Sequence, residues 1–114
     1  MDNCIFCKII KGDIPSNKVF ENDKVYAFRD INPQAPVHIL VVPKKHCANI
    51  LEGVAMKDGV MVDITEAIAE IVKAEGIDKT GFRVITNCGR DGAQSVEHLH
   101  FHILGGAPMG LKMA

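Results

Sequence analysis

Three histidines alternate with apolar residues near the C-terminus, in the stretch EHLHFHILGG. His98, His100 and His102 are two positions apart. A β-strand has a side-chain period of two, so the three rings would project from one face, successive rings roughly 6–7 Å apart. On a helix they would share no face. The opposite face of the strand would carry the apolar residues Leu99, Phe101 and Ile103.

The overall composition limits what this chain can do. It has 114 residues, 47% of them hydrophobic, so we expect a single domain over residues 1–114 with its own core. Thirteen basic and 14 acidic residues give a net charge of −1, which indicates neither a nucleic-acid partner nor a membrane-surface partner. No apolar run has transmembrane length, and the N-terminus lacks the basic region of a signal peptide. We therefore expect a cytoplasmic protein whose four cysteines are reduced.

Helix and strand signals follow one another along the chain. Asn3 would cap a first helix that Gly12 ends, and Asn22-Asp23 would make a tight hairpin turn. The expected elements are a short helix at 3–11, strands at 18–21, 25–30 and 37–43, a long helix at about 56–75, and strands at 81–87 and at the histidines. The hairpin-like grouping predicts an α+β fold in which the long helix covers one face of an antiparallel sheet. The imidazoles would point to the uncovered face.

The imidazole face allows three interpretations. The histidines could be ordinary surface or packing residues. They could bind zinc together with a further ligand, for which His38 and His46 are candidates. One of them could attack phosphorus and form a covalent phosphoramidate that water then cleaves, if its other ring nitrogen is held by a hydrogen bond. The residue pattern alone leaves all three interpretations open.

The loop before the histidines favours a ligand-binding site. It reads NCGRDGAQSVE and contains Asn87, Gly89, Gly92, Gln94 and Ser95. Glycines let the backbone approach a ligand closely, and amides and a hydroxyl can bind phosphate oxygens. By itself this would be an ordinary polar loop, but directly before the imidazoles it indicates the other half of a site.

These residues resemble a known family. HLHFHILGG fits the pattern His-φ-His-φ-His-φ-φ, where φ is apolar, of the histidine triad (HIT) superfamily. The stretches at 30–46, DINPQAPVHILVVPKKH, and at 91–96, DGAQSV, resemble its Hint-type branch, the purine nucleoside phosphoramidases. The resemblance runs from IFCKIIKGDIP to LGG. It implies an α+β, HIT-like fold with a five-stranded antiparallel sheet and one long and one short helix per subunit, in a homodimer whose sheets join.

The resemblance also implies an activity and catalytic residues. The substrates would be purine nucleoside 5′-phosphoramidates, with AMP or GMP linked to an amine, a lysine or an acyl group. His100 would be the nucleophile that becomes nucleotidylated, and His102 would contact the phosphate and the bridging atom. His98 would orient His100, with His38 behind it, and Ser95 would help to protonate the leaving group. The reaction would need no cofactor.

The same resemblance implies the substrate-binding residues. Asn87, Gln94 and Ser95 would bind the phosphate or the leaving side, and Asp30 would hold the ribose hydroxyls, for which a carboxylate is a suitable acceptor. Ala93 stands where the branch often has glycine, so a positive φ there would be strained. The base would be enclosed by Ile5, Phe6, Ile9, Phe28, Arg29 and Ile31, although core packing would explain the apolar residues of this set equally well.

The CIFC stretch raises the prospect of a structural zinc ion. Cys4 and Cys7 are spaced as half of a common zinc site. Some relatives complete it with the positions of His46 and His98, which would give a Cys2His2 site. Two semi-buried thiols without metal are the alternative. Zinc on His98 would also compete with its expected role beside His100.

Two other functions fit the sequence. One is a dinucleoside polyphosphate hydrolase or nucleotidyl transferase, also histidine triad activities. Gln94 precedes the triad rather than following it, and the strand ends in LGG, which favours the phosphoramidase branch. The other is a nucleotide-binding interaction module with little turnover, against which every catalytic-type residue of the family is present.

Overall fold

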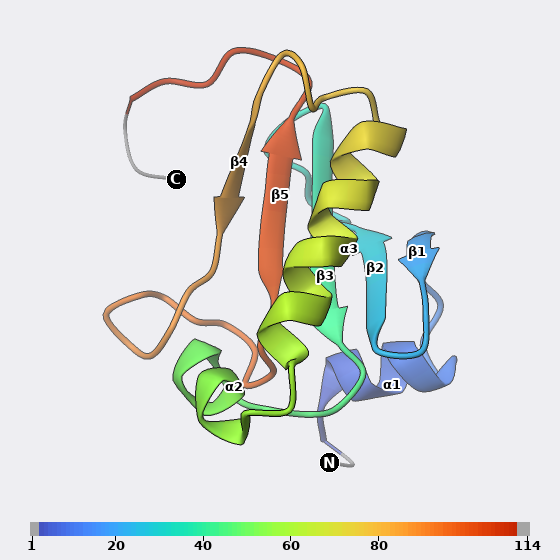
Figure 1. The fold of residues 1–114 in the computed structure, drawn as a ribbon, viewed down its shortest axis with the longest axis vertical. Coiled ribbons are helices and arrows are strands. Elements are labelled where there is room, and N and C mark those ends of the chain that lie inside the picture. The colour runs from blue at the N-terminus through green and yellow to red at the C-terminus, as the bar shows by residue number, and fades with distance from the viewer. Residues whose placement is uncertain (1–2, 112–114) are drawn as a thin grey trace.

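The computed structural model describes residues 3–111, which form one five-stranded antiparallel sheet with helices on both faces (Figure 1). The strand order is β1-β2-β3-β5-β4. The elements are α1 (Ile5–Lys11), β1 (Lys18–Glu21), β2 (Val25–Arg29), β3 (Val37–Pro43), α2 (Ile50–Met56), α3 (Val60–Ala74), β4 (Phe82–Ile85) and β5 (Phe101–Gly105). The α+β fold and the antiparallel five-stranded sheet expected from the sequence are confirmed.

The sheet separates two apolar clusters. On one face the residues of β2, β3 and β5 pack against α3, with Ile39, Ile64 and Ile103 fully buried. On the other face α1 packs against a smaller cluster that includes Phe6, Phe28 and Leu40. Central strands that are apolar on both sides explain why VHILVVP reads as a continuous hydrophobic run. The predicted position of Leu99, Phe101 and Ile103 on the α3 side is confirmed.

The first helix begins two residues later than expected. Cys4, rather than Asn3, is the N-cap, and its sulfur accepts the backbone N–H of Cys7 at 3.3 Å. Gly12 ends the helix as predicted, with φ at 86°, a left-handed conformation that glycine adopts without strain.

The long helix expected at 56–75 is two helices. α3 begins at Val60, after a left-handed Gly59, and the short helix α2 precedes it. Asn49 is the N-cap of α2: its side chain accepts the N–H of Glu52, while the Glu52 carboxylate accepts the N–H of Ala48. Asn followed three residues later by Glu, as in the sequence NILE, is a signal for the start of a helix. There are thus two short helices beside the long one.

Three strands also differ in their bounds, and β2 ends at Arg29 rather than at residue 30. β5 begins at Phe101, so the first two histidines precede the ladder, and instead the N–H of Leu99 donates to the carbonyl of Cys47. β4 covers only residues 82–85. The turn at Asn22-Asp23 includes Lys24 as well, because the Asn22 side chain accepts two backbone N–H groups, those of Lys24 and Val25.

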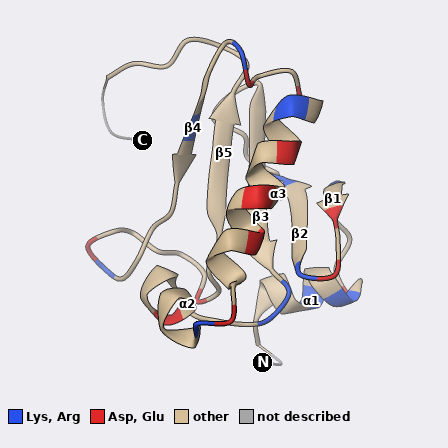
Figure 2. Cartoon of the chain, in the orientation of Figure 1, with Lys and Arg blue, Asp and Glu red and all other residues tan. Residues whose placement is uncertain are grey.

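Figure 2 shows basic and acidic residues on several elements of the fold. The outward side of α3 carries acidic residues, and Lys and Arg are spread over α1 and the turns. Within residues 3–111 no helix is long and apolar enough to cross a bilayer.

Candidate active site

The ring of His100 is held by the backbone next to it. Its Nδ1–H donates to the carbonyl oxygen of His98 at 2.7 Å. In a neutral imidazole this leaves the lone pair on Nε2, the form that a nucleophile requires. The ring is 4% exposed, and Phe6 meets it edge-on with centroids 5.0 Å apart.

His38 and His102 form a directed chain of hydrogen bonds. The backbone N–H of Gln34 donates to Nδ1 of His38 at 3.1 Å, so the neutral ring carries its proton on Nε2. That nitrogen lies 3.0 Å from Nδ1 of His102 and 3.5 Å from a carboxylate oxygen of Asp30. With Nδ1 of His102 accepting, its proton is on Nε2. His102 is therefore set up to donate from Nε2 to a substrate oxygen. His38 thus stands behind His102, not behind His98 as expected.

Burial favours the neutral form of two of the histidines, His102 and His98. Burial, with His100 and His38 nearby, lowers the pKa of His102 to about 4 from its usual 6.5. Burial also lowers the pKa of His98. Neutral rings are required for the donor and acceptor pattern described above.

The side-chain amides of the loop that precedes the histidines form hydrogen bonds with backbone groups of the protein. Gln94 donates to the carbonyls of Ala48 and Val96 and accepts from the N–H of Gly89. Asn87 donates to the carbonyl of Gly92. Gln94 was expected at the phosphate; the structure places its side chain among backbone groups that fix the loop.

A hollow of about 220 Å³ adjoins His102. Ser95 is exposed and lies on its edge, and Asn87 and Ala93 form part of its wall. A larger hollow of about 640 Å³ lies over Cys4 and His46, and Ser95 lines both. Ser95 is therefore shared by the two hollows.

The backbone near Ser95 is strained at one residue. Ala93 has φ at 60°, a left-handed conformation that a Cβ disfavours and that the alanine in place of the branch's glycine had put in doubt. A Cβ at Gly92 would lie 2.5 Å from the carbonyl oxygen of Cys88, so only glycine fits there. Strain of this kind persists where surrounding hydrogen bonds fix the loop.

The residues expected around the base divide into three groups. Phe6, Ile9 and Phe28 are buried together on the histidine side of the sheet. Ile5 is half exposed, and Ile31 is 92% exposed in the loop after β2. The side chain of Arg29 pairs with Glu75 at the end of α3, because it shares the sheet face of Ile39 rather than that of Phe28.

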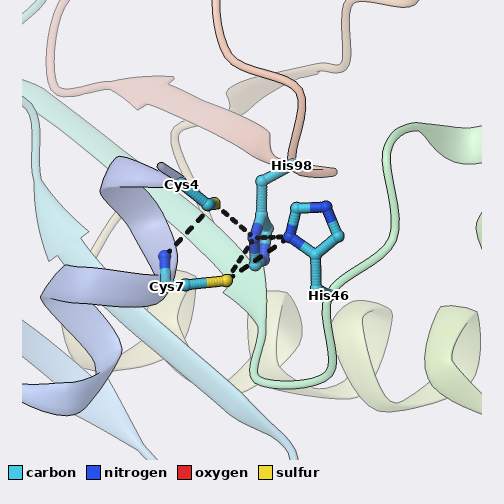
Figure 3. A group of neighbouring side chains, drawn as sticks. All are labelled: Cys4, Cys7, His46 and His98. Carbon is cyan, nitrogen blue, oxygen red and sulfur yellow. Dashed lines mark hydrogen bonds between the residues drawn. The ribbon is translucent and has the colours of Figure 1, made fainter. Parts of the chain in front are cut away.

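Four side chains from distant parts of the sequence converge beside the triad (Figure 3). We refer to Cys4, Cys7, His46 and His98 as the Cys–His group; their donor atoms lie within 4.8 Å of one another. Nδ1 of His98 is 3.3 Å from the sulfur of Cys4, 3.6 Å from that of Cys7 and 3.1 Å from Nδ1 of His46. Burial and the neighbouring Cys4 raise the pKa of Cys7 to about 11, so without a cation the Cys7 thiol is neutral.

The donor set of the Cys–His group fits zinc. Zinc bonds of about 2.0–2.3 Å in a tetrahedron place neighbouring donor atoms about 3.3–3.8 Å apart, close to the 3.1–3.6 Å separations of Nδ1 of His98 from its neighbours. Nε2–H of His98 donates to the carbonyl of Pro43 at 2.9 Å, which leaves Nδ1 free to bind a cation. Four protein ligands would leave no open position, which is typical of structural zinc.

His98 can bind a cation and orient His100 at the same time, because different parts of the residue do each. Its ring faces the Cys–His group, and its backbone carbonyl holds His100. The ring was expected to orient His100, and the carbonyl provides that contact instead.

Comparisons with known proteins identify the family of the chain. The HIT domain family matches residues 11–109. The chain belongs to this family. It is 42% identical to the purine nucleoside phosphoramidase of Escherichia coli (strain K12), over 99% of this chain and 95% of that protein. It is 49% identical to the 14 kDa zinc-binding protein of Zea mays, over 92% of this chain and 83% of that one.

Solved structures give the same result for the fold. The HIT family hydrolase from Clostridium thermocellum superposes with a TM-score of 0.94 at 46% identity, covering 100% of this chain and 99% of that chain. A histidine triad protein from Clostridium difficile gives 0.92 at 52% identity, covering 99% and 97%.

Some contacts of this HIT site involve groups that the sequence analysis did not name. They are the carbonyls of His98 and Pro43, the N–H of Gln34 and the edge contact of Phe6 with His100. Backbone groups leave no residue-type signal, so no pattern could have identified the first three. Phe6 was expected beside the base, and its contact with His100 depends on how α1 packs.

The low pKa of His102 predicts a pH dependence of stability. Between pH 6.5 and about 4 the unfolded chain binds a proton at this residue and the folded protein does not, so the free energy of unfolding falls as the pH falls through that window. Urea titrations at pH 4.5 and pH 7 would measure the change. In His102→Asn the free energy of unfolding should fall less between pH 7 and pH 4.5 than in wild type. The control Thr65→Ala, on the exposed side of α3, should show the same fall as wild type. An equal fall in wild type and His102→Asn would contradict the assignment.

Proposed function

We propose that this protein hydrolyses purine nucleoside 5′-phosphoramidates through a covalent nucleotidyl-histidine at His100. The observation that carries the proposal is the hydrogen bond from Nδ1 of His100 to the carbonyl of His98, which leaves the Nε2 lone pair available for attack. The 42% identity to a purine nucleoside phosphoramidase over nearly the whole chain supports the substrate class. AMP linked to an amine, to lysine or to an acyl group is the proposed range.

The reaction has two balanced steps. Nε2 of His100 forms a bond to phosphorus as the bond from phosphorus to the amine nitrogen breaks, and the leaving amine takes a proton from Ser95 or His102. Water then attacks phosphorus and breaks the phosphorus–histidine bond, which releases the nucleoside monophosphate and the neutral ring. The water proton returns to the group that served as acid. Transient nucleotidyl transfer divides one difficult substitution into two.

The remaining residues would bind the nucleotide. His102 would donate from Nε2 to a phosphate oxygen, and Asn87 and Ser95 line the adjoining hollow. Asp30 would accept from the ribose hydroxyls; one of its oxygens already accepts the N–H of Asn32 at 2.8 Å, which fixes the carboxylate. The exposed side chains of Ile5 and Ile31 would contact the base above the buried aromatic rings.

Replacing the proposed nucleophile should stop turnover without stopping binding. His100→Ala removes Nε2, so hydrolysis of adenosine 5′-phosphoramidate should fall by at least about a thousandfold, while the Kd for AMP stays close to that of wild type. Release of ammonia and titration calorimetry with AMP would measure the two. Leu51→Ala, an exposed aliphatic position on α2, serves as the matched control and should keep full activity.

The same assay can reject the proposal. If His100→Ala cleaves the phosphoramidate as fast as wild type does, His100 is not the nucleophile. Faster wild-type turnover of diadenosine polyphosphates than of the phosphoramidate would favour the polyphosphate hydrolase. Tight AMP binding with no turnover of any of these nucleotides would favour an interaction module.

We also propose that the Cys–His group holds a structural zinc ion that takes no part in the bond-breaking steps. If so, X-ray fluorescence of the purified protein should give one zinc per chain. Cys7→Ser should lose the metal, because an alcohol is a much poorer zinc ligand than a thiolate. Cys88→Ser changes a cysteine outside the group and should keep it. Equal zinc content in both variants would rule out this site.

A homodimer is proposed through β4, at the end of the sheet. β4 pairs with β5 on one side. α3 crosses the middle of the sheet and contacts β1, β2 and β3, so β4 lies at the edge that the helix does not cover (Figure 1). Phe82 and Val84, on the α3 face of β4, are 40% and 41% exposed. Unpaired sheet edges with apolar residues readily add a further strand.

The dimer can be tested by a charge on this strand. Val84→Glu places a carboxylate where the partner would bury it, so it should shift the mass measured by light scattering from two chains to one. Leu51→Glu makes the same change on α2 and should remain dimeric. A monomeric wild type, or a dimeric Val84→Glu, would contradict the proposed interface.

A further inference from the structure

We propose that the Cys–His group positions the nucleophile, so that Cys4, Cys7 and His46 act on catalysis through His98 without touching the substrate. The inference depends on the proposed role of His100. It goes beyond a zinc ion that only stabilises the fold, because it assigns the ion an effect on the geometry of one imidazole.

The first connection runs through His98 itself. Its ring is fixed at both nitrogens: Nε2 donates to Pro43, and Nδ1 faces the two sulfurs and His46. Its carbonyl accepts from Nδ1 of His100. His98 is completely buried, and it lies outside the sheet ladder that begins at Phe101. The ring contacts therefore take the place of ladder hydrogen bonds in fixing this carbonyl.

The second connection runs through Phe6. This residue lies between Cys4 and Cys7 on α1, so a cation held by both sulfurs would also fix the helix turn that carries it. The Phe6 ring meets His100 edge-on at 5.0 Å and His98 at 5.9 Å between centroids. The group thus reaches His100 from two elements that are far apart in the sequence.

Both connections act on the same property of His100. The carbonyl of His98 selects the tautomer with the proton on Nδ1, and Phe6 limits the tilt of the ring. If the Cys–His group is disrupted, the carbonyl and the helix turn become freer, and a smaller share of molecules presents a correctly aimed Nε2. A misplacement of about 1 Å at a reacting atom can reduce a rate by about a hundredfold.

The experiment uses His46→Asn, because His46 belongs to the group and makes no contact with His100. Two readouts are compared with the zinc-loaded wild type: the ¹⁵N NMR signals that report which nitrogen of His100 carries the proton, and the rate of the first turnover of adenosine 5′-phosphoramidate. We expect the Nδ1–H form to lose population and the first turnover to slow about 10–100-fold, as for other contacts around metal ligands. The Kd for AMP should change less than the rate.

A matched control separates positioning from general loss of stability. Ile71→Val shortens a buried side chain of α3, on the sheet face opposite the histidines, and should lower Tm without changing either readout. If Ile71→Val changes the tautomer as His46→Asn does, or if His46→Asn loses zinc and keeps both wild-type readouts, the inference is overturned.

Wild-type protein treated with a chelator gives a second test if His46→Asn does not fold. Circular dichroism should show the helices retained while the His100 tautomer signals change, and added zinc should reverse that change. Complete unfolding on zinc removal would overturn the inference, because the ion would then hold the whole fold. If wild type does not cleave the phosphoramidate, the proposed function fails, and the NMR signals still decide the positioning of His100.

Discussion

The pairing of β3 with β5 is the constraint on which the rest of the site depends. Its register sets Leu40 opposite His102 and His38 opposite Leu104, on the same face of the sheet. The rings of His38 and His102 can therefore form a hydrogen bond with each other. The same pairing places Ile39 and Ile103 on the other face, beneath α3. A shift of one residue would bury the imidazoles under the helix and expose the core.

The sequence predicts which face of the sheet a side chain occupies better than it predicts which residues that side chain contacts. Strict alternation was enough to assign His102 to one side and Ile103 to the other, since side-chain direction in an extended chain is a local property. Which atom each ring meets depends on segments that arrive from elsewhere. The ring of His98 meets residues of α1, and the ring of His102 meets His38 of β3. No local pattern contains those distances.

The differences between the sequence analysis and the structure have local physical causes. Asn3 is a good capping residue, but the sulfur of Cys4 is the acceptor at the helix start. The apolar periodicity around Met56 continues across two helices and does not reveal the left-handed Gly59 between them. Arg29 follows Phe28 in a strand, so the two side chains face opposite ways, and the parity rule applied to the histidines would have shown this.

The contact between Cys4 and His98 spans 94 residues of a 114-residue chain. Closing a loop of this length costs more conformational entropy than closing a short one, and that cost falls once the intervening hairpins and helices have formed. The Cys–His group should then be among the last parts of the protein to assemble, after the hairpins and α3. It follows that the nucleophile receives its final geometry at the end of folding, and that a nascent chain released before its last strand would have no working site.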